Sequence, residues 1–199
     1  MSSNRSRLYL WSSLWWYHFA FAEPATFPKA IYPAPFSVKV LRGPLFENIY
    51  LDKWYNDALQ NEEQVYFIAY DALLLGLPRL RQVRMSSNSC TIPKDFQSQI
   101  NKCYSTYTAG TEDKTAFGSK NSTAWTYSSP DILSAGYHWG KVAVYGGGGY
   151  YVDLPRNETE ARKVLEELFE GLWVDRGTRA IFLHLTVYNP NVNLFCVIS

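Results

Sequence analysis

Two strand patterns at the end of the chain limit most strongly what it can fold into. Apolar side chains alternate with other residues from Ala180 to Tyr188, which is the period of a half-buried β-strand. The apolar face consists of Ile181, Leu183, Leu185 and Val187. A second apolar run follows at Asn193–Ile198, after the turn-forming sequence Asn189–Pro190–Asn191. Together these segments predict a β-hairpin.

Earlier segments predict more strands and a second hairpin. Strand signals run through Gln64–Arg84, and Trp125–Tyr127 is typical of a short strand. Lys141–Tyr145 and Tyr150–Leu154 lie on either side of Gly146–Gly149, which predicts another hairpin. Because strand follows strand in the second half of the chain, we expect an antiparallel β-sheet with helices packed on one face. The fold class is therefore α+β, with hairpin extensions.

Two segments outside these strands predict helices. Pro44–Asp57 is a candidate short helix, with Leu45, Ile49 and Trp54 facing inward. Asn157, followed three residues later by Glu160, resembles a capping box that opens a second helix. The apolar stripe of this second helix consists of Val164, Leu165, Leu168 and Leu172. Trp173 follows the stripe, so we expect its side chain to be buried where this helix meets the sheet.

The three cysteines bear on the redox environment. The segment Pro93–Tyr104, which lies between Cys90 and Cys103, predicts a helix. Its apolar stripe consists of Phe96, Ile100 and Tyr104. A disulfide between Cys90 and Cys103 would join the end of a strand to the end of that helix and add roughly 3 kcal/mol of stability; two free buried thiols are the alternative. Cys196 lies in an apolar strand, so we expect a buried, unreactive thiol.

The amino-terminal region has the pattern of a processing segment. Basic residues precede the apolar stretch Leu8–Ala22, which closes on Ala20–Phe21–Ala22, as in a secretory signal peptide. A chance apolar leader and the remnant of a membrane anchor are the alternatives for residues 1–22. Four prolines within Pro24–Pro35 predict an extended linker over residues 23–37. We expect one domain over residues 38–199.

Glycosylation sequons accompany the leader and the cysteine pair. They are Asn121–Ser122–Thr123 and Asn157–Glu158–Thr159, with a third at Asn4–Arg5–Ser6 inside the leader. Together these features indicate the secretory route. Asn157 has a competing interpretation as the helix cap, and a glycan could coexist with that cap only if the side-chain amide stays exposed.

The sequence carries little sign of chemistry. Nineteen lysines and arginines balance 18 acidic residues, so no basic footprint for nucleic acid exists. The histidines are isolated, and Gly146–Gly149 lacks the lysine of a phosphate-binding loop. We therefore expect no catalytic residue, no metal and no cofactor. Arg79, Arg81 and Arg84 would meet a carboxylate or a lipid headgroup, or would simply form an exposed strand face.

An ordered set of short motifs resembles the polycystin domain across residues 43–198. The motifs are Gly43–Pro44–Leu45, Lys53–Asn56, Leu74–Arg84, the Cys90 and Cys103 pair, Ser122–Tyr127, His138–Gly140, Gly147–Leu154, Trp173–Arg179 and Tyr188–Cys196. The resemblance implies an exofacial domain between the first two transmembrane helices of a transient-receptor-potential-type cation channel. It also implies a helix-covered sheet, a disulfide between Cys90 and Cys103, glycans, and four copies packed in a ring above the pore.

The resemblance further implies partners and structural residues. The partners would be polycystin subunits in a homo- or hetero-tetramer, held in the membrane by transmembrane segments that this chain lacks. The residues expected to serve structure or assembly are Arg79, Arg81, Trp125, Trp139, Gly148, Trp173, Asp175 and Arg176. The family pattern places an acidic residue where this chain has His184. Two segments favour the polycystin-1-like branch of the family: Asn189–Pro190–Asn191 and Arg84–Cys90.

Three functions follow as hypotheses. The first is a channel ectodomain on the extracellular or lumenal face that mediates subunit assembly or gating. The second is a secreted, non-conducting module that binds polycystin subunits or an extracellular ligand. The third is a secreted sugar-binding or hydrolytic protein, suggested only by the many aromatic residues and the export signals; the sequence shows no recognisable carboxylate pair for glycoside hydrolysis.

Overall fold

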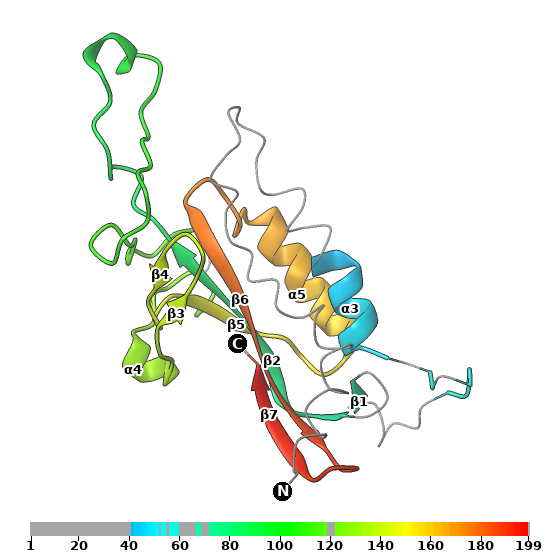
Figure 1. Cartoon of the computed structure of the whole chain (residues 1–199). Helices are drawn as coiled ribbons and strands as arrows, with labels where there is room; N and C mark the ends of the chain where they lie inside the picture. The colour runs from blue at the N-terminus through cyan, green and yellow to red at the C-terminus, as the bar shows by residue number, and fades with distance from the viewer. Residues whose placement is uncertain are drawn as a thin grey trace, which may run out of the picture.

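The computed structural model describes residues 41–51, 53–54, 56–59, 67–68, 72–118 and 122–198 (Figure 1). The predicted leader, the proline-rich linker and the sequon residues Asn4 and Asn121 lie outside this range. The elements in chain order are α3 (Pro44–Ile49), β1 (Phe67–Ile68), β2 (Ala72–Arg84), the 3-10 turn η2 (Lys94–Phe96), α4 (Pro130–Leu133), β3 (His138–Trp139), β4 (Val144–Tyr145), β5 (Tyr150–Asp153), α5 (Glu158–Glu170), β6 (Thr178–Asn189) and β7 (Leu194–Ile198).

The main sheet is antiparallel and centred on strand β2. Its strand order is β1-β2-β6-β7, and β5 also pairs with β2. The mixture of this sheet with a few helices confirms the expected α+β class. The predicted hairpin near the carboxyl end is also confirmed, because β6 and β7 pair antiparallel from Leu185 opposite Ile198 to Asn189 opposite Leu194.

Strand β2 contains an irregularity that its sequence explains. The register with β6 shifts between Leu75 and Arg79. Gly76 within this interval has a φ of 78°, a conformation that favours glycine, and Pro78 has no amide hydrogen to give to the sheet. The bulge separates the β1-paired end of β2 from the end that lies between β5 and β6.

Helices α3 and α5 cover one face of the sheet (Figure 1). Helix α5 buries Ala161, Leu165 and Leu168. They join a core cluster with Phe46, Leu80, Trp125, Leu154, Trp173 and Ile181. The predicted stripe is confirmed for Leu165 and Leu168 but is wrong for Leu172, which is 70% exposed because it lies beyond the helix end at a φ of 56°.

The opposite face of the sheet carries a second, smaller core. Alternation along β6 sends Ile181 to the helix-covered side and Phe182 to the other side. Phe182 packs there with Val83, Tyr107, Tyr145 and Ala180. The small β3–β4 sheet therefore lies against the face of the main sheet that α5 does not cover.

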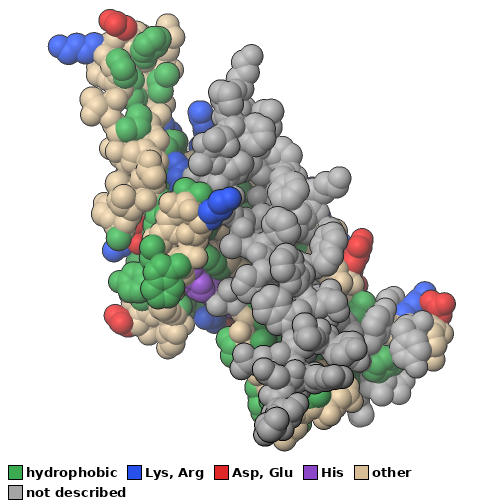
Figure 2. Space-filling model, in the orientation of Figure 1, with side chains coloured by type: hydrophobic (Ala, Val, Ile, Leu, Met, Phe, Trp, Pro, Cys, Tyr) green, Lys and Arg blue, Asp and Glu red, His purple; other side chains and the backbone are tan. Residues whose placement is uncertain are grey.

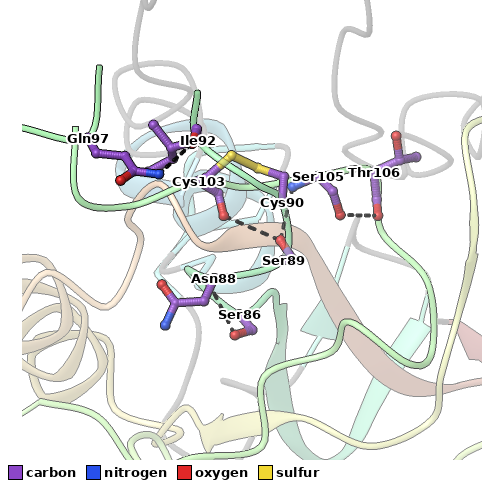
Figure 3. Close-up of a disulfide and its surroundings, with 9 residues drawn as sticks. All are labelled: Ser86, Asn88, Ser89, Cys90, Ile92, Gln97, Cys103, Ser105 and Thr106. Carbon is purple, nitrogen blue, oxygen red and sulfur yellow. Dashed lines mark hydrogen bonds between the residues drawn. A yellow bond between two sulfur atoms is a disulfide. The ribbon is translucent and has the colours of Figure 1, made fainter. Parts of the chain in front are cut away.

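Cys90 and Cys103 form the expected disulfide, with their Cα atoms 5.3 Å apart (Figure 3). The helix expected between them is wrong: only the short turn η2 forms, and the segment projects from the body of the domain as an arm (Figure 1). Phe96 and Ile100 on the predicted stripe are half exposed. An apolar stripe stabilises a helix only when it packs against something, and the arm carries it away from the core.

Four further expectations are corrected. Lys141–Tyr145 and Tyr150–Leu154 do not form a hairpin, because β4 pairs with β3 whereas β5 pairs with β2. Trp125–Tyr127 is a turn closed by the Trp125 amide donating to the Ser122 carbonyl, at 2.9 Å. Helix α3 ends at Ile49, well before Asp57. Cys196 is exposed because β7 is the last strand of the sheet, with no layer over it among the described residues.

Candidate functional site

Three arginines on β2, namely Arg79, Arg81 and Arg84, form contacts with later segments of the chain that contain the sequence motifs. Arg79 forms a two-pronged ion pair with Asp153 on β5: Nε donates to Oδ1 at 2.6 Å and Nη2 donates to Oδ2 at 2.9 Å. Its guanidinium also lies 4.4 Å from the centre of the Tyr151 ring. The partner expected for Arg79 is therefore present as a carboxylate of the same chain. About a third of each side chain stays exposed, so this pair forms part of the surface.

Arg81 is enclosed by the fold, with 1% of its surface exposed. Its Nη1 donates to the carbonyl oxygens of Gly146 and Gly148, at 2.8 and 2.7 Å. The guanidinium also lies 4.3 Å from the Phe182 ring centre. Burial is the main reason that the pKa of Arg81 falls to about 10, and the negative charge of Glu112 opposes this shift.

Glycines bring the two carbonyl groups to Arg81. A Cβ atom at Gly148 would collide with the side chain of Tyr127, so a larger residue there would push the loop away from β2. Gly149 has a φ of 142°, and a Cβ atom there would collide with the backbone of Gln82. The glycine run therefore provides close approach to β2 rather than the turn of a hairpin.

Arg84 fixes the turn that follows α5. Its Nη2 donates to Asp175 Oδ2 at 2.8 Å, and Gln82 Nε2 donates to the Trp173 carbonyl at 2.8 Å. Asp175 also accepts the Gly177 amide through Oδ1 at 2.8 Å, and its carbonyl accepts the Thr178 amide at 3.1 Å. The motif Trp173–Arg179 is thus a turn fastened to the centre of the sheet.

Both motif tryptophans on the helix side are buried. Trp173 is 1% exposed, and its Nε1 donates to the Ala124 carbonyl at 2.8 Å, which confirms the predicted burial between helix and sheet. Trp125 lies beside it in the same cluster and meets the Phe117 ring edge-on, with centroids 5.0 Å apart. The two rings anchor the Ser122–Tyr127 turn to the helix-covered core.

Trp139 differs from the two buried tryptophans, because 82% of its surface is exposed. Further exposed apolar side chains lie near it in the sequence: Ile132, Tyr137, Val142 and Val144. We call these five residues the hairpin patch, and Figure 2 shows hydrophobic side chains gathered over the region of β3 and β4. Sequence reasoning selected only Trp139; the signal for the others was the density of aromatic and β-branched residues in a segment without strand alternation.

The remaining motif residues and the edge strand are also at the surface. Arg176 is exposed, and its carbonyl accepts a hydrogen bond from Arg179 Nη1 at 3.0 Å. On β7, Leu194, Phe195 and Val197 expose more than half of their surface. The structure therefore divides the residues predicted to serve structure or assembly into two groups: residues that hold segments together inside the domain, and residues at its surface.

His184 takes the place opposite Arg79 on β6 and receives a hydrogen bond from Arg81 Nε at 3.2 Å. The ring of His138 on β3 lies 5.9 Å from that of His184. Desolvation, followed by the positive charges of Arg81 and the neighbouring His138 and Arg79, lowers the pKa of His184 to about 4. Desolvation and Arg81 also lower the pKa of His138. A neutral imidazole thus stands beside Arg81.

Lowering the pH from about 6.5 to about 4 is expected to destabilise the fold through His184. Its pKa is near 6.5 in the unfolded chain and about 4 in the fold. The unfolded chain therefore binds more protons within this window, and stability falls as the pH falls. Because the side chain is partly exposed, solvent screening should limit the loss to about 1–2 kcal/mol. Chemical denaturation at a series of pH values measures the effect.

The variant His184→Gln separates this effect from carboxylate titration over the same range. Glutamine keeps an acceptor for Arg81 Nε but takes up no proton. We expect a shallower pH dependence than in the original chain. Equal slopes for the two proteins would show that His184 does not titrate as its surroundings indicate.

An open groove of about 490 Å³ lies beside these residues. Arg79, Arg81, Asp153 and His184 line it together with residues 133–136 and parts of β6 and β7. Across the described part of the chain, no three histidine, cysteine or acidic side chains come together as a metal site. None of the helices in this part is long and apolar enough to cross a membrane.

Comparison with known proteins agrees with these motifs. The family model of the polycystin domain matches residues 43–199. Human polycystin-2-like protein 1 is 46% identical over 157 residues, which cover 79% of this chain and 20% of that protein. Polycystin-2 of Danio rerio is 45% identical over 160 residues, covering 80% of this chain and 18% of that protein. The chain thus spans about a fifth of the length of these two relatives.

The same comparison corrects the expected branch. Human polycystin-1 is 37% identical over 132 residues, which cover 63% of this chain and 3% of that protein. The two polycystin-2-type relatives match more residues at higher identity. The prediction that this chain belongs to a polycystin-1-like branch is therefore not supported. With the family model matched from Gly43 to the last residue, this chain belongs to the polycystin domain family.

Proposed function

We propose that this domain lies on the extracellular or lumenal face of a polycystin-type cation channel and joins channel subunits to one another. The observation that carries the proposal is the match to the polycystin domain across residues 43–199. The Cys90–Cys103 disulfide supports the location, because such bonds persist in oxidising compartments. The partners would be polycystin subunits, in a homo- or hetero-tetramer.

The division of the motif residues supports an assembly role. Arg81, Arg84, Trp125 and Trp173 serve the interior, so they form a scaffold rather than a contact surface. Arg81 has almost no exposed surface for a neighbouring subunit, so we assign it no contact between subunits. Arg79 remains a candidate for a contact between subunits, because its pair with Asp153 is one-third exposed.

The hairpin patch is the surface that we assign to the neighbouring subunit. Trp139 and Tyr137 expose most of their area, and aromatic residues of this kind are enriched at protein interfaces. Trp139 and Val144 are cross-strand partners, and exposed apolar side chains that lie together favour association over solvation. A patch of this size gives a modest affinity, so membrane anchoring would supply the effective concentration that assembly needs.

Co-precipitation tests the proposal. The free chain should be mainly monomeric at micromolar concentration, whereas a membrane-anchored form should co-precipitate with a full-length polycystin-2-type subunit. The double variant Tyr137→Ser, Trp139→Ala should reduce recovery several-fold without changing the melting temperature. Leu172→Asn is the matched control, since Leu172 is an exposed apolar residue outside the patch and asparagine tolerates its positive φ.

Two results would contradict the proposal at different levels. If the anchored chain recovers no polycystin subunit, the assembly role is wrong. If the double variant binds as well as the control variant, assembly uses another surface and the assignment of the hairpin patch is wrong.

A further inference from the structure

We infer that Asn157 is both the cap of helix α5 and an N-glycosylation site. Asn157–Glu158–Thr159 is a sequon that begins at the N-cap of α5 and continues into the first turn of this helix. The inference rests on the proposed extracellular or lumenal location, because the modification takes place there. The two roles of Asn157 compete only if they need the same atom of its side chain.

The geometry gives the two roles to different atoms. Asn157 Oδ1 accepts a hydrogen bond from the Glu160 amide at 3.2 Å, which is the bond of an N-cap. Nδ2 donates no hydrogen bond to the residues that the structure describes, and the side chain is exposed. The capping oxygen is therefore turned toward the helix, while the nitrogen that carries a glycan stays available.

The chemistry leaves the cap intact. The amide nitrogen bonds to C1 of an oligosaccharide carried on a lipid pyrophosphate, and the C1–O bond to that pyrophosphate breaks. The lipid pyrophosphate departs with the electron pair, and Nδ2 loses one of its two protons. The product is still a secondary amide with a free carbonyl oxygen, so Oδ1 can accept from Glu160 as before.

The surroundings leave room for a bulky sugar. Arg156, Thr159 and Glu160 are exposed beside Asn157, so a glycan displaces no packed side chain. The Glu158–Arg162 ion pair, at 2.6 Å, lies on the exposed surface of the first turn. The hairpin patch belongs to the opposite side of the sheet, as the separate cores around Ile181 and Phe182 show. The glycan would therefore cover the α5 side and leave the patch free.

Three variants of the full chain, expressed through the secretory route, test the inference. Asn157→Asp keeps an N-cap oxygen but removes the sequon, and Thr159→Ala removes the sequon at another position. Asn157→Gln removes both glycan and cap. We expect each variant to lack the mass of one glycan that the original chain carries. Peptide mass spectrometry of the original chain and of each variant, before and after glycosidase treatment with oxygen-18 labelling, measures this difference. Only Asn157→Gln should also lower the melting temperature of the deglycosylated protein.

The sequon at Asn121 distinguishes failure of this inference from failure of the proposed location. An unmodified Asn157 peptide together with a glycosylated Asn121 peptide would overturn the inference and leave the lumenal location standing. Unmodified peptides at both positions would overturn both. Equal melting temperatures for deglycosylated Asn157→Gln and Asn157→Asp would overturn the capping role.

Discussion

Trp173→Ala is expected to lower the free energy of unfolding by about 3–5 kcal/mol, the range for truncating a buried tryptophan. The ring is 1% exposed and fills the junction between α5, the Ser122–Tyr127 turn and the sheet. Truncation would leave a cavity there and would deprive the Ala124 carbonyl of its donor at 2.8 Å. Urea denaturation followed by circular dichroism measures the loss.

Trp139→Ala is the matched control for this change. The same residue type is removed, but 82% of Trp139 is exposed, so stability should change by less than about 0.5 kcal/mol. Trp173→Phe should fall between the two, because it keeps a ring and loses the hydrogen bond to Ala124. A Trp173→Ala protein that unfolds at the same urea concentration as the original would refute the placement of this ring.

Arg81→Met is expected to cost about 2–5 kcal/mol, because it removes the donor for two backbone carbonyls at once. Gly146 and Gly148 accept from one nitrogen of Arg81, so both carbonyls lose this donor in the variant. Methionine keeps most of the side-chain volume, so the change isolates the guanidinium. Thermal and chemical denaturation give the difference.

Arg79→Met provides the comparison on the same strand. Its ion pair with Asp153 is one-third exposed, and pairs of this kind contribute about 1 kcal/mol or less. Similar losses for the two variants would mean that the Arg81 contacts to the glycine carbonyls contribute no more than a surface ion pair.

The elements that the sequence predicted correctly are those with a local period and a partner nearby in the chain. The β6–β7 hairpin follows from alternation around Asn189–Asn191, and α5 follows from Asn157 and its apolar stripe. The helix expected at Pro93–Tyr104 had a similar stripe but no surface to pack against. Periodicity reports which side chains share a face; it does not report whether that face is covered.

The candidate site was less accessible to prediction. Arg79, Arg81 and Arg84 stand out in the sequence, but Asp153, the glycine carbonyls and Asp175 come from segments far along the chain. Nothing in the local sequence distinguishes the buried Arg81 from Arg79, two residues earlier, whose side chain is one-third exposed. Both arginines pair with β5 on one edge of β2 and with β6 on the other. The distinction arises because the Gly146 and Gly148 carbonyls come from a distant segment to Arg81, a contact that only the folded chain defines.

The pairing of β2 with β6 sets the order in which this domain can form during synthesis. Leu80 lies opposite Leu183, about 100 residues later, so the ribosome must deliver nearly all of the domain before the central pair closes. Contacts of such long sequence separation slow folding, because the intervening loop must first be brought together. Until β6 emerges, one long edge of β2 has no native partner and needs protection from other unfinished chains.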